Sequence, residues 1–349
     1  MFFRPRLFPP YARFIVYNAA CRDFTVMEKY IMVIFVYLLA YLGTAACAAI
    51  VALNVIKYLK KPQHVRWELY PVGHEQRHRV SYGGSYLEEV GWWQQKQEGS
   101  FTGGLKALLV EVLFLHATFE HNKALWSRTY PFHFGLYMLF GGFFLTILAA
   151  LAQLMGVMPG VFFTTVGNLV QVLSLVGFIG VIGGACGLIH RRVSQEDLRK
   201  YSTREHYFNL GLFALLGLLG VCAWLGNSSF FELGRNFIAN MLSFKYVDPG
   251  SASFSLYLIL GFALAAYVPA THMGHFYMKY FLYHDIRWGD QPSQDNAAIQ
   301  EKIGRMLNYR VSWSAPHIQG DGKKTWAEVA TADPTANPGG KDANSDGKK

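Results

Sequence analysis

The sequence predicts an all-α integral membrane protein, a bundle of five spanning helices, and its charge distribution is the main reason. Hydrophobic residues make up 52% of the 349 residues and charged residues only 16%, which is typical of membrane proteins. Between Arg128 and Arg191 the chain runs 62 residues without an Asp, Glu, Lys or Arg, whereas about 20 apolar residues suffice to cross a bilayer as a helix. Backbone groups in lipid must bond to one another, and unbroken apolar runs favour helices over a closed barrel.

Charged residues and one Pro-Gly pair delimit the five spans. The uncharged block is too long for a single helix and divides naturally at Met158-Pro159-Gly160. The predicted helices cover residues 30–57, 131–155, 161–189, 206–231 and 249–278. The chain therefore divides into an N-terminal extension (1–29), the first span (30–57), a connecting loop (58–130), a bundle of the other four helices (131–290) and a tail (291–349).

Basic residues predict the orientation, because Lys and Arg are retained on the cytoplasmic side of a membrane. Three connections are rich in them: the one after the first helix, the one between the third and fourth, and the one after the fifth. All three fall on the same side. We therefore expect a multi-pass protein of the cell inner membrane with its N-terminus outside and its C-terminal tail in the cytoplasm.

The N-terminal extension disagrees with this orientation. It carries five basic residues that should resist export: Arg4, Arg6, Arg13, Arg22 and Lys29. A start at Met27 would remove the conflict, so we expect the upstream segment to be an extension of the annotated reading frame. A cleaved signal peptide is disfavoured, because no apolar core lies between Arg13 and Lys29.

The loop and the tail carry further signals. Leu105 to Phe119 has apolar residues at helical spacing and predicts a helix that either lies on the inner membrane surface or packs against the next helix or a partner. The tail becomes polar after Asp290 and is expected to be disordered from about residue 331. The net charge of +9 is spread over these inner segments, which indicates contact with lipid headgroups and not with nucleic acid. The four cysteines are isolated, so no iron–sulfur or zinc site is expected.

Histidines are the candidate ligands of a cofactor. The chain has twelve, and none falls in the outer half of the predicted bundle. His133 lies just inside the second helix and His275 near the inner end of the fifth, so both are expected at the same shallow depth. Two imidazoles on separate helices can hold a haem iron from both sides. The plainer alternative is that such histidines only form hydrogen bonds between helices.

Other residues near this level have secondary roles in the prediction. His272 precedes His275 by three positions and is expected on the same face about one turn deeper. It is the only plausible helix ligand for a second haem, whose other ligand would be a loop histidine such as His206 or His121. Arg128 and Arg191 lie at the inner face and could bind haem propionates in bidentate geometry, although arginines here also serve as topology signals.

Several segments resemble the cytochrome b family of the respiratory nitrate reductase gamma subunit. The resemblance is closer to the membrane cytochrome b subunits of heterodisulfide-reductase-type relatives and of the sulfate-reducer complex linked to cytochrome c3. It covers roughly residues 28 to 331. It rests on RWELYPVGHE (66–75), LWSRTYPFHFGLYMLF (125–140), VPATHMGHFY (268–277) and VSWSAPHIQGDGKKTWAEVAT (311–331).

The resemblance implies a b-type haem held by His133 and His275 near the cytoplasmic face. The family's outer haem ligands map to Phe143 and Tyr257, neither of which is a good ligand, so one haem is expected. The implied function is that of an electron-transfer subunit of a quinone oxidoreductase complex in sulfate respiration. It would exchange electrons between menaquinone and a cytoplasmic iron–sulfur subunit, with a periplasmic multihaem cytochrome c as a further partner.

Two subsidiary expectations follow. The menaquinone headgroup is expected near Lys123, Tyr130 and His121, just outside the second helix. The iron–sulfur subunit is expected to dock on the segments 66–75 and 311–331, whose tryptophans and tyrosine suit either an interface centre or a lipid surface. They are Trp67, Tyr70, Trp313 and Trp326.

The rival functional class is a haem-free membrane anchor or a transporter. Against transport, no predicted helix contains an acidic residue and no internal repeat is visible, whereas many transporters are built from repeats.

Overall fold

A computed structural model describes residues 10–61, 72–73, 75, 85, 88–94, 99–282, 296–315 and 318–332. The chain forms two compact units, residues 1–62 with 101–287 and residues 63–100 with 288–349. Most of the segment 66–75, including Trp67 and Tyr70, lies outside the described residues, as does the tail beyond residue 332.

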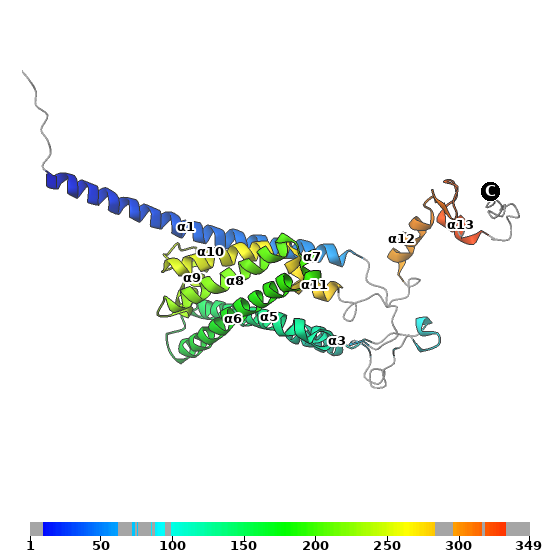
Figure 1. The fold of residues 1–349 in the computed structure, drawn as a ribbon, viewed down its shortest axis with the longest axis horizontal. Coiled ribbons are helices and arrows are strands. Elements are labelled where there is room, and N and C mark those ends of the chain that lie inside the picture. The colour runs from blue at the N-terminus through cyan, green and yellow to red at the C-terminus, as the bar shows by residue number, and fades with distance from the viewer. Residues whose placement is uncertain are drawn as a thin grey trace, which may run out of the picture. The chain divides into compact units, whose positions relative to one another are not determined.

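The first unit is an all-α bundle in which five helices are long and apolar enough to cross a membrane (Figure 1). The predicted fold class is therefore confirmed, and the chain is a multi-pass membrane protein. The helices are α1 (Pro10–Leu59), α5 (Lys123–Leu154), α6 (Val161–Ser194), α8 (Arg204–Leu225) and α10 (Ala252–Tyr267). Within α1 the membrane-spanning part is Lys29–Leu59, and the fifth span continues past α10 to Ala270.

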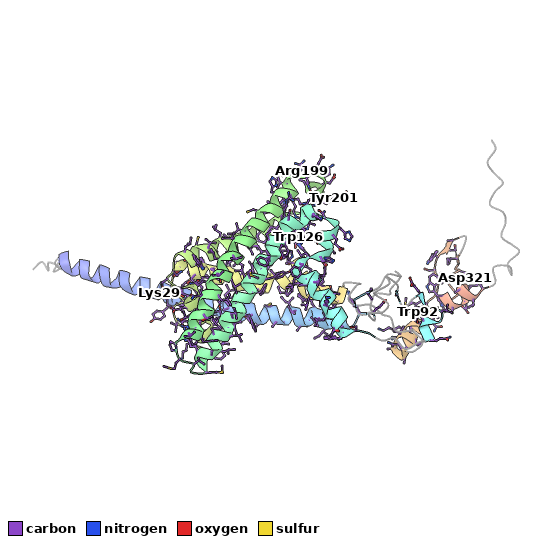
Figure 2. The ribbon with its side chains drawn as sticks, turned by 90° about the horizontal axis from the view of Figure 1, so that it is seen from below. Lys29, Trp92, Trp126, Arg199, Tyr201 and Asp321 are labelled. Carbon is purple, nitrogen blue, oxygen red and sulfur yellow. The ribbon has the colours of Figure 1, made fainter. Side chains whose placement is uncertain are left out.

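The spans run alternately up and down, so each connection falls at one of two ends. At one end, Lys29 forms an ion pair with Asp248, which precedes α10, and this hydrogen bond lowers the pKa of Asp248. At the other end, Asn54 of α1 donates a 2.7 Å hydrogen bond to Tyr277 Oη. The second end collects the basic connections and is called the basic end below; the first is called the far end. Figure 2 shows Lys29 at the far end and Trp126 and Arg199 at the basic end.

The fourth span is shorter than predicted, and an extra helix follows it. The prediction ran to Phe231, but α8 stops at Leu225, and α9 (Phe230–Leu242) occupies what was taken as a loop. Ser229 begins α9 by accepting a hydrogen bond from the Glu232 backbone N–H at 3.2 Å. The sequence pattern Ser-x-x-Glu is a recognised helix start and could have revealed it. Phe230, Phe231 and Phe237 are buried in the bundle.

The fifth predicted helix is interrupted, which corrects the expected 249–278. After α10 the chain makes two 3₁₀ turns, η3 (Val268–Ala270) and η4 (His272–Gly274), before α11 (His275–Leu282). Pro269 has no backbone N–H to continue the helix, and Thr271 is extended with φ −108° and ψ 177°. His272 and His275 therefore do not share a face of one continuous helix.

The loop helix predicted over Leu105–Phe119 is two helices, α3 (Phe101–Phe114) and α4 (His116–His121). Leu115 separates them in the left-handed conformation, with φ 51° and ψ 50°. Both helices contact α5: Tyr137 donates a hydrogen bond to the Val112 carbonyl of α3, and the Trp126 ring packs edge to face against Phe119 of α4, with ring centres 5.1 Å apart. The short α7 (Glu196–Tyr201) connects α6 to α8.

Glycines let α5 and α6 approach closely. A Cβ added at Gly135 would lie 2.6 Å from the Val181 nitrogen, and one at Gly184 would lie 2.5 Å from the Phe132 nitrogen. Helices in lipid gain little from the hydrophobic effect and associate through close packing of such small residues. This pair of helices is therefore the packed centre of the bundle.

Tyrosines attach α1 to the bundle at the far end. Tyr37 is fully buried, and its ring centre lies 4.8 Å from that of Phe237 in α9. Tyr41 donates a 2.6 Å hydrogen bond to the Met241 carbonyl. Each tyrosine thus combines apolar packing with a polar group that needs a partner in lipid.

The second unit contains short elements, each described here by itself. They are η2 (Trp92–Gln94), α12 (Ala297–Leu307), β1 (Ser314–Ala315), its antiparallel partner β2 (Ile318–Gln319) and α13 (Trp326–Thr331). Thr325 and Glu328 form a capping box at the start of α13, and the hydrogen bond from the Thr325 backbone lowers the pKa of Glu328. The Trp313 and Trp326 rings meet edge to face with centres 6.0 Å apart.

The glycine packing predicts a difference between neighbouring substitutions. Gly184→Ala places a methyl group against the α5 backbone and should destabilise the bundle by about 1–3 kcal/mol. A Cβ at Gly183 meets nothing within 4 Å, so Gly183→Ala should leave stability unchanged or slightly higher because alanine favours helix. Thermal unfolding of both variants in detergent measures the difference, and equal melting temperatures would contradict the packing argument.

Candidate functional site

The structure brings His133 and His275 together at the basic end. His133 lies in the third turn of α5, and His275 is the first residue of α11. Their ring centres are 6.1 Å apart with an angle of 61° between the ring planes. The two imidazoles come from separate segments that are 142 positions apart in the sequence (275 − 133). They are therefore at the same depth in the bundle.

Backbone carbonyls fix the proton on each ring. His133 Nδ1 lies 2.8 Å from the Thr129 carbonyl, and His275 Nδ1 lies 3.3 Å from the His272 carbonyl. Because a carbonyl can only accept, each Nδ1 carries the proton and each Nε2 keeps its lone pair. A histidine held in this way is ready to ligate a metal, since the bond to the carbonyl orients the ring and raises its basicity.

The spacing of the rings suits one metal ion between them. Metal–nitrogen distances of about 2 Å put the centres of two opposed imidazoles about 6 Å apart. Among the described residues no cluster of three or more His, Cys, Asp or Glu could hold a metal ion. A metal between these two rings would take its other ligands from elsewhere, as haem iron does from the porphyrin. The donor set therefore fits an iron porphyrin with two axial histidines.

His272 lies apart from this pair and faces α8. Its Nδ1 is 3.2 Å from Glu205 Oε1, and its ring centre is 5.2 Å from that of His206. His206 Nδ1 accepts a 3.0 Å hydrogen bond from the Thr203 backbone N–H, so its proton is on Nε2, where a metal would have to bind. This arrangement favours a capping role for His206 and disfavours the pair as ligands of a second haem.

The two predicted propionate partners lie nearer the solvent than His133. Arg128 donates to the Ala124 carbonyl, and its side chain packs against Gly187 of α6. Arg191 follows Gly187 by one turn of α6, and its Nε is buried with no hydrogen-bond partner among the described residues. An unpaired buried guanidinium nitrogen is costly, so Arg191 has an unused donor for an anionic group.

An ion pair beside the histidines was missed by the sequence analysis. Lys279 Nζ is 2.7 Å from Glu111 Oε1, and the side chains are 28% and 9% exposed. Lys279 follows His275 by four positions on α11, so the two are neighbours on that helix surface. The signal in the sequence was one acidic residue in a largely apolar helix whose only other charged residue is Lys106, which is unusual enough to suggest a function.

The two positions to which the family's outer haem ligands map, Phe143 and Tyr257, have surroundings that differ from those of the histidine pair. Phe143 is 49% exposed on the lipid-facing side of α5, so it does not face the bundle interior. Tyr257 of α10 packs in an aromatic cluster with Phe178 of α6, Phe230 of α9 and Phe254, with ring centres 5.5–6.2 Å from its own. A Cβ at Gly220 would lie 2.2 Å from the Phe178 ring. Aromatic side chains thus fill this half of the bundle.

The residues expected near a quinone lie along one side of α5. Tyr130 is stacked between Trp126, with ring centres 4.5 Å apart, and Phe134, at 5.8 Å. Lys123 lies over the Phe119 ring at 5.3 Å, and His121 ends α4 with an exposed side chain. Trp126, Tyr130 and Phe134 thus form an aromatic stack along α5 at the basic end, and Lys123 and His121 lie beside it.

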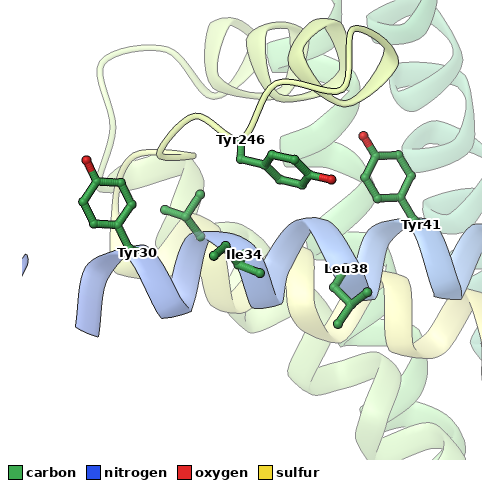
Figure 3. A pocket seen from close by; sticks show the side chains of 6 residues that line it. Tyr30, Ile34, Leu38, Tyr41 and Tyr246 are labelled. Atoms are coloured by element: carbon green, nitrogen blue, oxygen red, sulfur yellow. The ribbon is translucent and has the colours of Figure 1, made fainter. Parts of the chain in front are cut away.

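A hollow of about 360 Å³ lies on α1 near the far end (Figure 3). Its lining consists of Tyr30, Val33, Ile34, Leu38, Tyr41 and Tyr246. This lining includes no Asp, Glu, His, Lys or Arg, and the hollow lies at the opposite end of the bundle from the histidine pair. Tyrosines at this level are typical of the aromatic belt at a membrane surface.

Comparisons with known proteins add no assignment to this geometry. No protein-family model, curated protein or solved structure matches the chain. The functional argument therefore rests on the residues of the site.

The histidine geometry predicts the effect of removing either ring. His133→Ala and His275→Ala should each lower haem content at least about ten-fold, because each removes one axial ligand of the same iron. His116→Ala is a matched control, since His116 pairs only with Glu120 on the exposed face of α4. Reduced-minus-oxidised spectra of purified protein measure haem content, and membrane fractionation checks insertion. Full haem content in either variant would reject that ligand.

Proposed function

We propose that the chain is the cytochrome b subunit of an anaerobic respiratory complex in the cell inner membrane. It transfers electrons between menaquinone and an iron–sulfur subunit bound on the cytoplasmic side. The basic end is then cytoplasmic, because Lys and Arg are retained there. The observation that carries the proposal is the His133–His275 pair, with ring centres 6.1 Å apart.

The protein's own contribution is to hold and tune the haem. When bound, the haem carries one electron at a time. The Thr129 and His272 carbonyls orient the two rings, Arg191 offers a buried cationic donor, and the α5–α6 packing fixes the depth of His133. A site in which both ligands are held by backbone bonds needs little rearrangement when the iron changes charge.

The sequence resemblance supports the choice of partners. Related cytochrome b subunits work with an iron–sulfur chain similar to the catalytic chain of heterodisulfide reductase, and with a periplasmic multihaem cytochrome c. In this chain, the described tail residues 311–315 and 318–331 include β1, β2 and α13, and Trp313 is 49% exposed. An exposed tryptophan in an ordered polar segment is typical of the centre of an interface.

Electron transfer is proposed to use one haem near the cytoplasmic face. The far half offers aromatic side chains at Phe143 and Tyr257 in place of ligands, and Phe178 fills the adjacent space. A periplasmic cytochrome would then exchange electrons with this subunit through quinone or another cofactor of the complex.

This proposal predicts a haem b spectrum with one haem per chain. Purified protein reduced with dithionite should show the alpha band of a b-type haem. Haem should equal protein in molar amount, because the His133–His275 pair suits axial ligation, whereas in the His206–His272 pair the His206 Nδ1 accepts a hydrogen bond from the Thr203 backbone N–H. Complete absence of haem would leave the haem-free anchor as the function. Two haems per chain would reject the one-sided arrangement.

The docking role of the tail predicts that a deletion separates partner binding from haem binding. Removing residues 311–349 should release the iron–sulfur subunit on copurification while leaving haem content unchanged, because the histidine pair belongs to the other compact unit. Removing only residues 333–349 is the matched control and should retain the partner. Copurification that survives the longer deletion would count against the docking site.

A further inference from the structure

The Glu111–Lys279 pair is unusual because it is buried in an apolar part of the molecule. Their 2.7 Å contact joins α3 to α11, and the Glu111 side chain is only 9% exposed. Removing two charges from water costs more free energy than a surface pair returns. Ionisable residues retained at membrane depth are for this reason functional candidates, to be considered together with their partner.

A strained turn holds the carboxylate in place. Glu111 Oε2 accepts a 2.9 Å hydrogen bond from the Ala117 backbone N–H, across the break at Leu115. Leu115 has φ 51°, a conformation that glycine adopts freely and leucine adopts only at a cost. Backbone strain of this kind concentrates at functional sites. The break turns the start of α4 toward Glu111, so both carboxylate oxygens have a fixed partner.

The pair lies beside the proposed haem ligands. Lys279 is one turn after His275 on α11. Tyr137 is one turn after His133 on α5, and the His133 and Tyr137 ring centres are 6.4 Å apart. The Tyr137 hydroxyl donates to the carbonyl of Val112, the neighbour of Glu111. The Glu111–Lys279 pair is thereby linked to His133 through Tyr137 and Val112, and to His275 through one turn of α11.

The same place is reachable from lipid. Leu105, Leu109 and Leu113 form the face of α3 opposite Glu111 and are 41–47% exposed, as expected for a helix that lies against acyl chains. Lys279 retains 28% exposure. Phe114, three positions after Glu111 and its neighbour on the helix surface, is 54% exposed. An apolar molecule that diffuses in the bilayer can therefore approach the ion pair past Phe114 and Lys279.

We propose that Glu111 and Lys279 form the headgroup site of a membrane hydroquinone, with Glu111 as proton acceptor. The inference rests on the proposed function and specifies its quinone site. A hydroquinone hydroxyl donates to the carboxylate, and the oxygen of the product quinone accepts from the ammonium group. The aromatic stack at Tyr130 of α5, where the sequence analysis placed the quinone, contributes no carboxylate, and the hollow at Tyr30 is at the far end.

The reaction balances with groups named above. Oxidation of one hydroquinone releases two protons and two electrons. At each deprotonation a quinol O–H bond breaks and a carboxyl O–H bond forms on Glu111, which then passes the proton to water at the basic end. The two electrons leave one at a time to the ferric b-type haem of the proposed function, which passes the first electron on to the iron–sulfur subunit and returns to the ferric state before it accepts the second. Electron flow in the opposite direction reverses each step.

The test separates quinol binding from haem binding. Full-length complex is reduced with menadiol, a soluble naphthoquinol, and separately with dithionite, which needs no site. Glu111→Gln should slow reduction by menadiol about 100-fold, the usual range for loss of a positioned base, while dithionite reduces the full haem content. Binding of 2-heptyl-4-hydroxyquinoline N-oxide, followed by its fluorescence, should weaken at least about ten-fold in Glu111→Gln and Lys279→Met.

Two controls keep the outcomes distinct. Glu120→Gln removes a carboxylate from α4 that pairs only with His116 and should behave as wild type. Glu111→Gln/Lys279→Gln replaces the pair with neutral groups, so it avoids an unpaired buried charge. If Glu111→Gln bound 2-heptyl-4-hydroxyquinoline N-oxide as tightly as the wild type, the quinol site would be rejected and the proposed function would stand. Loss of haem in the double variant would also reject the quinol site, because the ion pair would then be needed for haem binding. A wild-type complex without haem would overturn the proposed function.

Discussion

The cost of an unpaired polar group in hydrocarbon is the constraint on which this structure depends. It requires that each span be a helix, since lipid offers no partner for a backbone amide. It also explains the side-chain contacts: Tyr41 bonds to a carbonyl of α9, and Glu111 is paired on both oxygens. Other polar side chains of the bundle, such as Thr146, bond to a carbonyl of their own helix.

The interruption of the fifth span creates the candidate site. Had the helix continued through Pro269, the backbone N–H groups after it would bond to carbonyls one turn back, and His272 and His275 would lie on one face. The two 3₁₀ turns instead send His272 toward Glu205 and leave the His272 carbonyl for His275 Nδ1. A single residue without an N–H thus separates the proposed ligand His275 from His272, which faces Glu205 of α8.

The two halves of the bundle use aromatic residues differently. At the far end, Tyr257 and Phe178 pack against each other and against α9, which leaves a filled hydrocarbon core. At the basic end, tyrosines and imidazoles alternate around His133, and Tyr137 reaches out to α3. The far half is thus filled by aromatic packing, and the basic end holds the polar side chains of the candidate site beside the close α5–α6 contact at Gly135 and Gly184.

The sequence by itself determined the five spans, the common side of the basic connections and the matched depth of His133 and His275. These follow from charge and hydropathy, which are properties of neighbouring residues and can be read directly along the sequence. Only the tertiary structure decided that His272 faces α8, that α9 closes the far end and that Glu111 meets Lys279. Each of these depends on a break in a helix or on a contact between distant segments, where the direction of a side chain is set by packing and not by its own sequence neighbours.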